Sequence, residues 1–214
     1  MLNPKDLLLY LCTDRVLALG RPLAGAVEEA IAGGVTMVQL REKEASSREF
    51  YEIALELRAL TRRHHVPLVI DDRLDIALAA GAEGLHIGQS DLPLAAARRL
   101  AGKDMFIGVS VSTVEEALEA ERNGADYLGA GAVYPTGSKA DAGEAVGLGR
   151  LAAICAAAKI PVVGIGGVNV DNAGAVIKAG AAGIAVISGI LSQPSIGGAA
   201  RGLRRVLDEG KIRG

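Results

Sequence analysis

The sequence predicts an α/β protein that folds as a single-domain (β/α)₈ barrel, the TIM-barrel architecture, over residues 1–214. Short apolar, β-branched runs alternate along the chain with Ala/Leu/Glu/Arg segments of helical period. Eight such runs fit into 214 residues, close to the lower size limit of roughly 200 for this barrel. Half of the residues are hydrophobic, only 3% are aromatic and 28 are glycine, as expected for closely packed parallel strands buried on both faces.

The strand candidates are apolar runs bounded by polar or turn-forming residues. In chain order they cover residues 7–13, 36–41, 67–71, 84–88, 106–110, 127–133, 161–166 and 183–188. Helices are expected between most of them, at residues 46–64, 73–81, 92–101, 113–124, 147–159, 169–180 and 199–210. Ser46 with Glu49, and Ser112 with Glu115, have capping-box spacing, so each pair predicts the start of a helix.

A doubly wound open sheet is the main alternative architecture, because it also alternates strands with helices. The glycines argue against it. The segment GIGGVN has the first two glycines of a dinucleotide fingerprint, but Asn169 stands in place of the third and the segment comes late in the chain. No linker or change of composition indicates a second domain, so the barrel is preferred.

Charge and cysteine content limit the partners. The net charge is −2 and the pI about 6.0, which predicts neither nucleic-acid nor anionic-membrane binding. Cys12 and Cys155 lack metal-ligand spacing and are expected to be buried thiols in a reducing compartment. Residues 179–200 carry no charge, but serines, a proline and glycines interrupt them, so a buried strand followed by a loop is expected. We therefore expect a cytoplasmic protein with small-molecule partners.

Polar residues gather at the predicted carboxyl ends of the strands, which is where such barrels bind ligands. They are Gln39, Arg41 and Lys43; Asp71 and Asp72; Gln89, Ser90 and Asp91; Ser110; Thr136, Gly137, Ser138 and Lys139; Gly166 and Gly167; and Ser188. This pattern predicts a binding site at one rim of the barrel.

The cationic cluster on the second strand predicts an anion site. Gln39, Arg41 and Lys43 alternate in sequence, so they would share one face of a continued strand. Two cations pointing together repel each other unless an anion lies between them, which favours phosphate or diphosphate. The alternative is a solvated strand end paired with Glu42 or Glu44.

Asp72 and Asp91 follow adjacent strands, so their carboxylates could converge. Oxygen ligands without a nearby His or Cys pattern favour Mg²⁺, which commonly uses one or two carboxylates with substrate phosphate and water. Each aspartate alone could instead cap a helix, since Asp91 precedes Leu92-Pro93. The neighbouring cations favour the metal.

The ends of the seventh and eighth strands predict a second anion site. Loops after these strands frequently bind phosphate through backbone N–H groups, and here they carry Gly166-Gly167 and Ile187-Ser188-Gly189. His86 ends the fourth strand and is expected to be a hydrogen-bonded core residue that could also reach the site. Two anion sites and a metal suggest that two phosphorylated molecules are joined with loss of diphosphate, or that one is isomerised.

These motifs resemble a known family. VQLREK, IDDRLDIALAAGAEGLHIGQSDLP, IGVSVST, GADYLGAGAVYPTGSKADAG, PVVGIGGVN and GIAVIS occur in the order seen in thiamine-phosphate synthase (thiamine phosphate pyrophosphorylase). The resemblance implies a (β/α)₈ transferase of thiamine biosynthesis. Such an enzyme joins 4-amino-2-methyl-5-hydroxymethylpyrimidine diphosphate to 4-methyl-5-(2-hydroxyethyl)thiazole phosphate with Mg²⁺. Its mechanism is dissociative: diphosphate leaves first, and the thiazole nitrogen captures a methylene cation.

The resemblance also implies roles for individual residues. Those expected to bind the pyrimidine diphosphate are Gln39, Leu40, Arg41, Glu42, Lys43, Asp71, Ser110 and Lys139, of which Arg41, Lys43, Ser110 and Lys139 are expected to be catalytic. Those expected to bind the thiazole phosphate are Thr136, Gly137, Ser138, Gly167, Ile187 and Ser188. Asp72 and Asp91 are expected to hold Mg²⁺. The family commonly has Asn-Asp where this chain has Asp71-Asp72, and Thr-Pro-Thr-Lys where it has Thr-Gly-Ser-Lys.

Other functions remain open at this point. A thiazole tautomerase paralogue shares the fold but needs no diphosphate machinery, so Arg41, Lys43, Asp72, Asp91 and Lys139 argue for the synthase. A non-catalytic phospholigand-binding barrel would have little use for paired carboxylates. A Schiff-base aldolase would need a desolvated lysine, whereas Lys139 is expected on a loop. A homo-oligomer is compatible with the sequence.

Overall fold

The computed structural model describes residues 2–137 and 145–212 and shows eight parallel strands closed into a barrel. The strands are β1 (Leu9–Cys12), β2 (Met37–Leu40), β3 (Leu68–Asp71), β4 (Gly84–Ile87), β5 (Phe106–Val111), β6 (Tyr127–Gly131), β7 (Val162–Ile165) and β8 (Gly183–Val186). Each strand pairs with its neighbour in chain order, and β1 pairs with β8. The predicted (β/α)₈ fold is confirmed.

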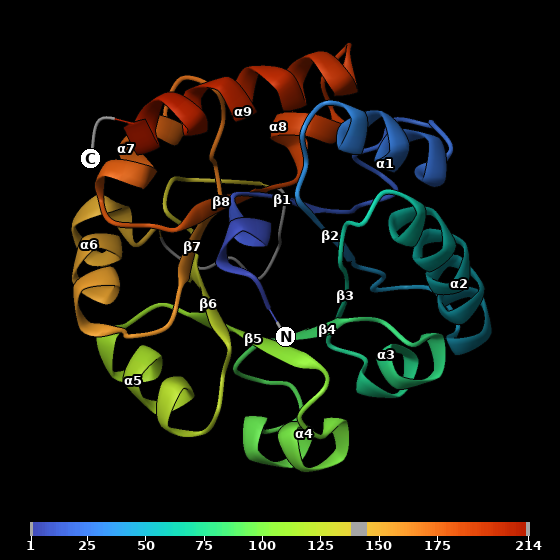
Figure 1. The fold of residues 1–214 in the computed structure, drawn as a ribbon, viewed down its shortest axis with the longest axis horizontal. Helices are drawn as coiled ribbons and strands as arrows, with labels where there is room; N and C mark the ends of the chain where they lie inside the picture. The colour runs from blue at the N-terminus through green and yellow to red at the C-terminus, as the bar shows by residue number, and fades with distance from the viewer. Residues whose placement is uncertain (1, 138–144, 213–214) are drawn as a thin grey trace.

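The helices surround this ring of strands (Figure 1). They are α1 (Leu23–Ala32), α2 (Ser47–Arg63), α3 (Leu74–Ala80), α4 (Leu94–Ala101), α5 (Val114–Arg122), α6 (Gly147–Ala157), α7 (Ala173–Lys178), α8 (Ser188–Leu191) and α9 (Ile196–Ile212). A 3₁₀ turn, η1 (Pro4–Leu7), packs against β1 and β8.

Most predicted elements are present, and their ends shift by a few residues. Helix α1 was not predicted from the sequence. The loop expected after β8 contains α8, and the last helix begins at Ile196, three residues before the predicted start.

The capping predictions have different outcomes. Ser46 Oγ accepts a hydrogen bond from the Glu49 backbone N–H (3.2 Å) at the start of α2, as predicted. At α5 the capping box lies one residue later than predicted: Thr113 Oγ1 accepts from the Glu116 N–H, and the Glu116 carboxylate accepts from the Thr113 N–H. Glu116 also accepts from the Ser112 N–H, which brings Ser112 into the same turn.

Glycines make room for the few aromatic side chains inside the barrel. A Cβ at Gly108 of β5 would lie 2.0 Å from Cζ of Tyr127, and a Cβ at Gly84 of β4 would lie 2.2 Å from Cε2 of Phe106. The Phe106 and Tyr127 rings meet edge to face, with centroids 6.3 Å apart. The interior is therefore a filled core in which glycine on one strand admits a ring from the next.

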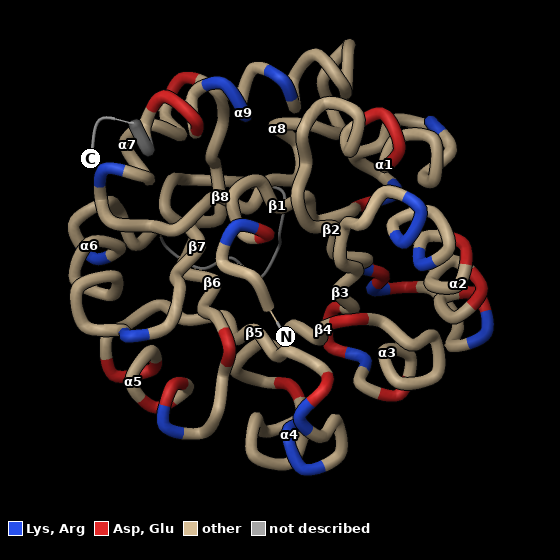
Figure 2. The backbone as a smooth tube through the Cα atoms, viewed as in Figure 1, with Lys and Arg blue, Asp and Glu red and all other residues tan. Residues whose placement is uncertain are grey.

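Charged residues of both signs are interspersed around the ring of helices (Figure 2). Within the described part of the chain, no helix has both the length and the apolar character needed to span a membrane. Cys12 is buried, and burial raises the pKa of the half-buried Cys155 thiol to about 11.

Candidate active site

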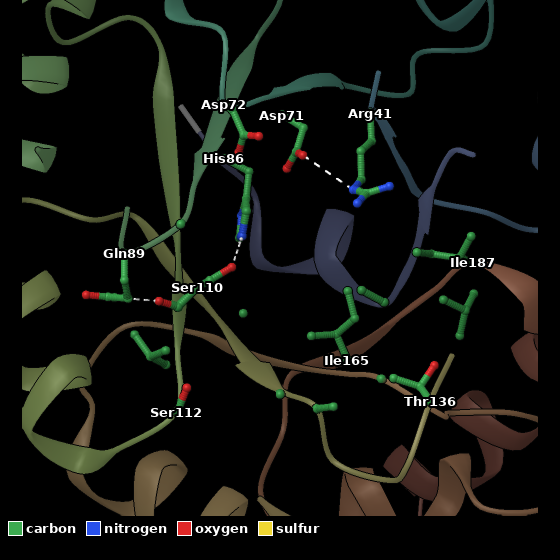
Figure 3. Close-up of a pocket in the computed structure, with 18 of the residues that line it drawn as sticks. Arg41, Asp71, Asp72, His86, Gln89, Ser110, Ser112, Thr136, Ile165 and Ile187 are labelled. Carbon is green, nitrogen blue, oxygen red and sulfur yellow. Dashed lines mark hydrogen bonds and ion pairs between the residues drawn. The ribbon is translucent and has the colours of Figure 1, made fainter. Parts of the chain in front are cut away.

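A cavity of about 390 Å³ opens at the carboxyl ends of the strands. Residues of β3 through β8, and of the loops that follow β2 through β8, line it (Figure 3). Of the predicted site residues, those in its lining are Arg41, Lys43, Asp71, Asp72, Asp91, Ser110, Thr136, Gly167, Ile187 and Ser188. The barrel thus brings together at one rim residues that are up to 147 positions apart (188 − 41).

One wall carries the cations and a buried carboxylate. Asp71 Oδ2 lies 3.7 Å from Arg41 Nε and 3.5 Å from Lys43 Nζ. Arg41 is largely buried and also pairs with Asp14, yet its Nε makes no hydrogen bond within the described structure. A buried guanidinium N–H without an acceptor indicates room for an anionic ligand.

Asp72 and Asp91 form the candidate metal site. Asp72 has a left-handed backbone (φ 61°), and its N–H donates to the His86 carbonyl (2.8 Å). Burial opposes ionisation of Asp72, but hydrogen bonds with Lys43 and Asp91 outweigh it and lower the pKa of Asp72. Burial, followed by the Asp72 carboxylate, raises the pKa of Asp91. Two adjacent carboxylates competing for one proton are a donor set that fits a divalent cation.

Asp91 is not a helix cap. Its Oδ2 accepts from the Gly88 N–H (2.6 Å), and the N-cap position of α4 is Pro93. The described residues contain no cluster of three or more His, Cys, Asp or Glu side chains that could enclose a metal. Two carboxylates leave the remaining ligand positions to water and substrate oxygens, which suits Mg²⁺.

Ser110, at the end of β5, is fixed from two sides (Figure 3). Its Oγ lies 2.9 Å from His86 Nε2, and its carbonyl accepts a hydrogen bond from Gln89 Nε2 (2.7 Å). His86 is 6% exposed, lines the cavity, and contacts Tyr127 OH through Nδ1 (2.9 Å). The core position expected for His86 is confirmed, and the histidine also reaches the site.

The other wall is formed by the loops after β6, β7 and β8. Gly166 and Gly167 both have positive φ, and a Cβ at Gly167 would lie 2.7 Å from the Pro135 carbonyl oxygen. Asn172 Nδ2 donates to the Gly167 carbonyl (2.9 Å) and holds this turn. Thr136 from the loop after β6, Gly167 from the loop after β7, and Ile187 and Ser188 from the end of β8 all line the cavity.

Other predicted site residues lie elsewhere. Gln39 lies deeper in the barrel, Leu40 is buried and absent from the lining, and Gly137 is exposed outside it. The Glu42 carboxylate pairs with Arg15 (2.8 Å), so it does not pair with the cationic cluster. Ser138 and Lys139 fall outside the described residues.

Some lining residues were not predicted to bind. Gln89 follows β4 and was noted as polar but given no role in binding. Its position at the carboxyl end of a strand could have predicted one. Ser112 lies two residues beyond Ser110, a spacing that also points to the same rim. Ile165 and Val168 are apolar residues of a buried strand and its loop, and no sequence signal separates them from the core.

Known proteins are similar to this chain in sequence and in fold. The family model described as thiamine monophosphate synthase matches residues 9–190. A thiamine-phosphate synthase of Clostridium acetobutylicum is 59% identical over 196 residues, covering 92% of each chain. One from Methanospirillum hungatei is 53% identical and covers 90% of this chain and 94% of the relative.

The solved structures agree. Thiamine phosphate pyrophosphorylase from Pyrococcus furiosus superposes with a TM-score of 0.90 at 46% identity, covering 97% of this chain and 98% of that one. A 3-hexulose-6-phosphate synthase, at 23% identity and a TM-score of 0.65, shares the fold. The sequence, the barrel and the matches over nearly the whole length agree that the chain belongs to the thiamine monophosphate synthase family.

Proposed function

We propose that this chain is a thiamine-phosphate synthase. It would join 4-amino-2-methyl-5-hydroxymethylpyrimidine diphosphate to 4-methyl-5-(2-hydroxyethyl)thiazole phosphate and release diphosphate. The observation that carries the proposal is that one cavity has two polar walls. Arg41, Lys43 and the Asp72–Asp91 pair lie on one wall, and Thr136 with the glycine turn at Gly167 lies on the other. Such a cavity can hold a diphosphate and a phosphate together.

The cationic wall would bind the leaving group. Arg41 Nε has no hydrogen-bond acceptor within the described structure, and Lys43 is held beside it by Asp71 and Asp72. Both side chains can donate to diphosphate oxygens and neutralise the charge that builds up as the carbon–oxygen bond breaks. Lys139 stays a predicted contributor.

Asp72 and Asp91 would hold Mg²⁺, which supplies further charge neutralisation on the diphosphate when it is bound. Lys43 contacts Asp72, and burial together with the Asp72 carboxylate raises the pKa of Asp91. The protein thus keeps two closely spaced carboxylates ready for a cation.

The opposite wall would position the nucleophile. Thr136 and the backbone N–H groups near Gly167 and Ser188 would bind the thiazole phosphate, so that the ring nitrogen faces the carbon losing diphosphate. The apolar side chains of Ile165 and Val168 line the same cavity and would limit access of water to the pyrimidine methylene cation. The proposed mechanism needs no protein nucleophile. A cytoplasmic location and a homo-oligomer stay predictions.

The test is product formation from both substrates, with Mg²⁺ and with EDTA, followed by chromatography of the fluorescent oxidation product of thiamine phosphate. We expect product only with Mg²⁺. A folded protein that makes no thiamine phosphate in either condition would contradict the proposal. If such a protein isomerised a thiazole carboxylate phosphate, the tautomerase alternative would replace it.

A further inference from the structure

A continuous chain of hydrogen bonds crosses the barrel interior and ends at the candidate active site. Gln39 Nε2 donates to Tyr10 OH (2.8 Å). Tyr10 OH lies 3.0 Å from Tyr127 OH, and Tyr127 OH lies 2.9 Å from His86 Nδ1. On the far side of the imidazole ring, His86 Nε2 lies 2.9 Å from Ser110 Oγ (Figure 3). The chain thus links side chains of β2, β1, β6 and β4, in that order, to Ser110 on β5.

The chain is buried until it reaches the cavity. Tyr10 is 2% exposed, Tyr127 is fully buried and Gln39 is 2% exposed. Burial raises the pKa of both tyrosines well above the ordinary value, so both phenols keep their protons. Gly108 makes room for the Tyr127 ring, because a Cβ there would clash with it. The strand on which Ser110 lies is thus built to admit the tyrosine.

The direction of the hydrogen bonds follows from the placement of the Gln39 amide, whose nitrogen faces Tyr10 while its buried Oε1 has no hydrogen-bond partner among the described residues. The Gln39 amide nitrogen can only donate, so the Tyr10 oxygen accepts from it. The Tyr10 proton then goes to Tyr127, its neighbouring acceptor, since a buried hydroxyl proton without an acceptor is costly. The Tyr127 proton in turn goes to His86 Nδ1.

This direction selects one form of the imidazole. With Nδ1 accepting from Tyr127, neutral His86 carries its proton on Nε2 and donates it to Ser110 Oγ. The Ser110 hydroxyl proton is then left to point elsewhere, and the cavity lies on that side. If His86 instead carried its proton on Nδ1, Ser110 Oγ would donate its hydroxyl proton to His86 Nε2.

We propose that Tyr127, supported by Tyr10, is a positioning residue that fixes the Nε2–H tautomer of His86 and so makes Ser110 a hydrogen-bond donor to the bound pyrimidine diphosphate. This inference rests on the proposed function. No proton leaves any member of the chain during the reaction: the serine donates a hydrogen bond to an acceptor atom of the substrate, which becomes stronger as negative charge grows on the departing diphosphate.

The test compares three Tyr→Phe variants. Tyr127→Phe removes the donor to His86 and keeps the ring that packs against Phe106. Tyr10→Phe removes the donor to Tyr127 and leaves the contact of Tyr127 with His86 in place. Tyr51→Phe, on the outer helix α2, is the matched control.

We expect kcat to fall about tenfold in Tyr127→Phe, less in Tyr10→Phe, and not in Tyr51→Phe. The tenfold fall is equivalent to about 1.4 kcal/mol, the size expected for one oriented hydrogen bond in the transition state. The KM for the pyrimidine diphosphate should change less than kcat, and thermal unfolding should show that all variants are folded.

The second measurement is ¹⁵N NMR of the imidazole nitrogens in the ligand-free protein, which needs no activity. The chain has three histidines, and His64 and His65 are exposed, so their Gln variants assign the remaining signals to His86. We expect a protonated Nε2 and an unprotonated Nδ1 in the wild type, and a mixture of tautomers in Tyr127→Phe.

The outcomes separate the two proposals. Wild-type protein that makes no thiamine phosphate refutes the proposed function, whatever the NMR shows. Active wild type with His86 protonated on Nδ1, or a Tyr127→Phe variant with wild-type kcat and an unchanged tautomer, refutes the positioning role alone.

Discussion

Asp71 Oδ2 lies 3.5 Å from Lys43 Nζ, and only 6% of the Asp71 side chain is exposed. The same oxygen lies 3.7 Å from Arg41 Nε. A buried carboxylate therefore compensates two cations at the rim, and its negative charge would oppose a diphosphate bound there as proposed. This relationship gives a physical role to the aspartate that stands where the family commonly has asparagine.

Asp71→Asn should lower the stability of the protein and raise its affinity for the pyrimidine diphosphate. The free energy of unfolding of the ligand-free protein should fall by about 1–3 kcal/mol, because Arg41 loses a partner. The KM for the pyrimidine diphosphate should fall about fivefold, equivalent to about 1 kcal/mol, because a negative charge leaves the site. Urea unfolding with and without inorganic diphosphate checks both. A variant that gains no more stability from diphosphate than the wild type does would contradict this role.

Asp91→Asn should weaken Mg²⁺ binding at least about tenfold, since it removes one of two adjacent carboxylates. Titration calorimetry of the protein with Mg²⁺ and inorganic diphosphate measures this directly. The control is Asp75→Asn, which changes an exposed carboxylate held by Arg73 outside the cavity lining. Equal Mg²⁺ affinity in the two variants would contradict the assignment of Asp91 as a metal ligand.

Glu42→Gln should stabilise the protein at neutral pH. Burial raises the pKa of Glu42 despite its ion pair with Arg15, so the folded state binds a proton more tightly than the unfolded state does. The free energy of unfolding therefore falls as pH rises, first through the pKa of Glu42 in the unfolded state and then through its higher pKa in the folded state. Above both pKa values the decrease is complete.

The stabilisation by Glu42→Gln should therefore be fully present at pH 7 and shrink near about pH 4, where the carboxyl is largely neutral in both states. Urea unfolding at the two pH values measures the difference, with Glu44→Gln as an exposed control. A stabilisation that is larger at the acidic pH would show that folding does not raise the pKa of Glu42.

Gly167→Ala should damage thiazole phosphate binding selectively. The new Cβ would lie 2.7 Å from both the Pro135 carbonyl oxygen and the Tyr134 Cβ, so the loop before Thr136 must shift. We expect the KM for thiazole phosphate to rise about tenfold, equivalent to about 1.4 kcal/mol, with little change for the pyrimidine diphosphate.

Gly81→Ala is the matched control for Gly167→Ala. Gly81 has the same φ of +65°, but nothing lies within 4 Å of the position its Cβ would occupy. Gly81→Ala should lose about 1 kcal/mol of stability from the left-handed backbone. Gly167→Ala should lose more, because its Cβ also collides with backbone, and only Gly167→Ala should change a KM. Equal KM values for thiazole phosphate in the two would show that the glycine turn does not form the phosphate site.

The barrel could be predicted because its strands are buried on both faces and are continuous apolar runs, as at Val162–Ile165. The rim could be predicted because parallel strands end at the same edge, which brings Arg41, Asp72 and Ser110 into one cavity. Helix α1 was missed, although its lack of a side-chain cap is shared by α3 and α4, which were predicted.

The interior polar chain could not be predicted. Tyr10 and Tyr127 are 117 residues apart, and each follows or precedes apolar residues that look like ordinary core. Their hydroxyls meet only because the closed barrel sets the register of β1 and β6 and because Gly108 leaves space for a ring. Likewise, strand alternation alone did not show that Glu42 turns toward Arg15.

The most direct test of the central claim is a ³¹P NMR time course with both phosphorylated substrates and Mg²⁺ in one tube. We predict that thiazole phosphate is consumed while thiamine phosphate and inorganic diphosphate appear in equal amounts, and that Asp72→Asn slows all three changes together. Release of diphosphate without consumption of thiazole phosphate would contradict the account, because the cavity would then hydrolyse one substrate instead of joining two.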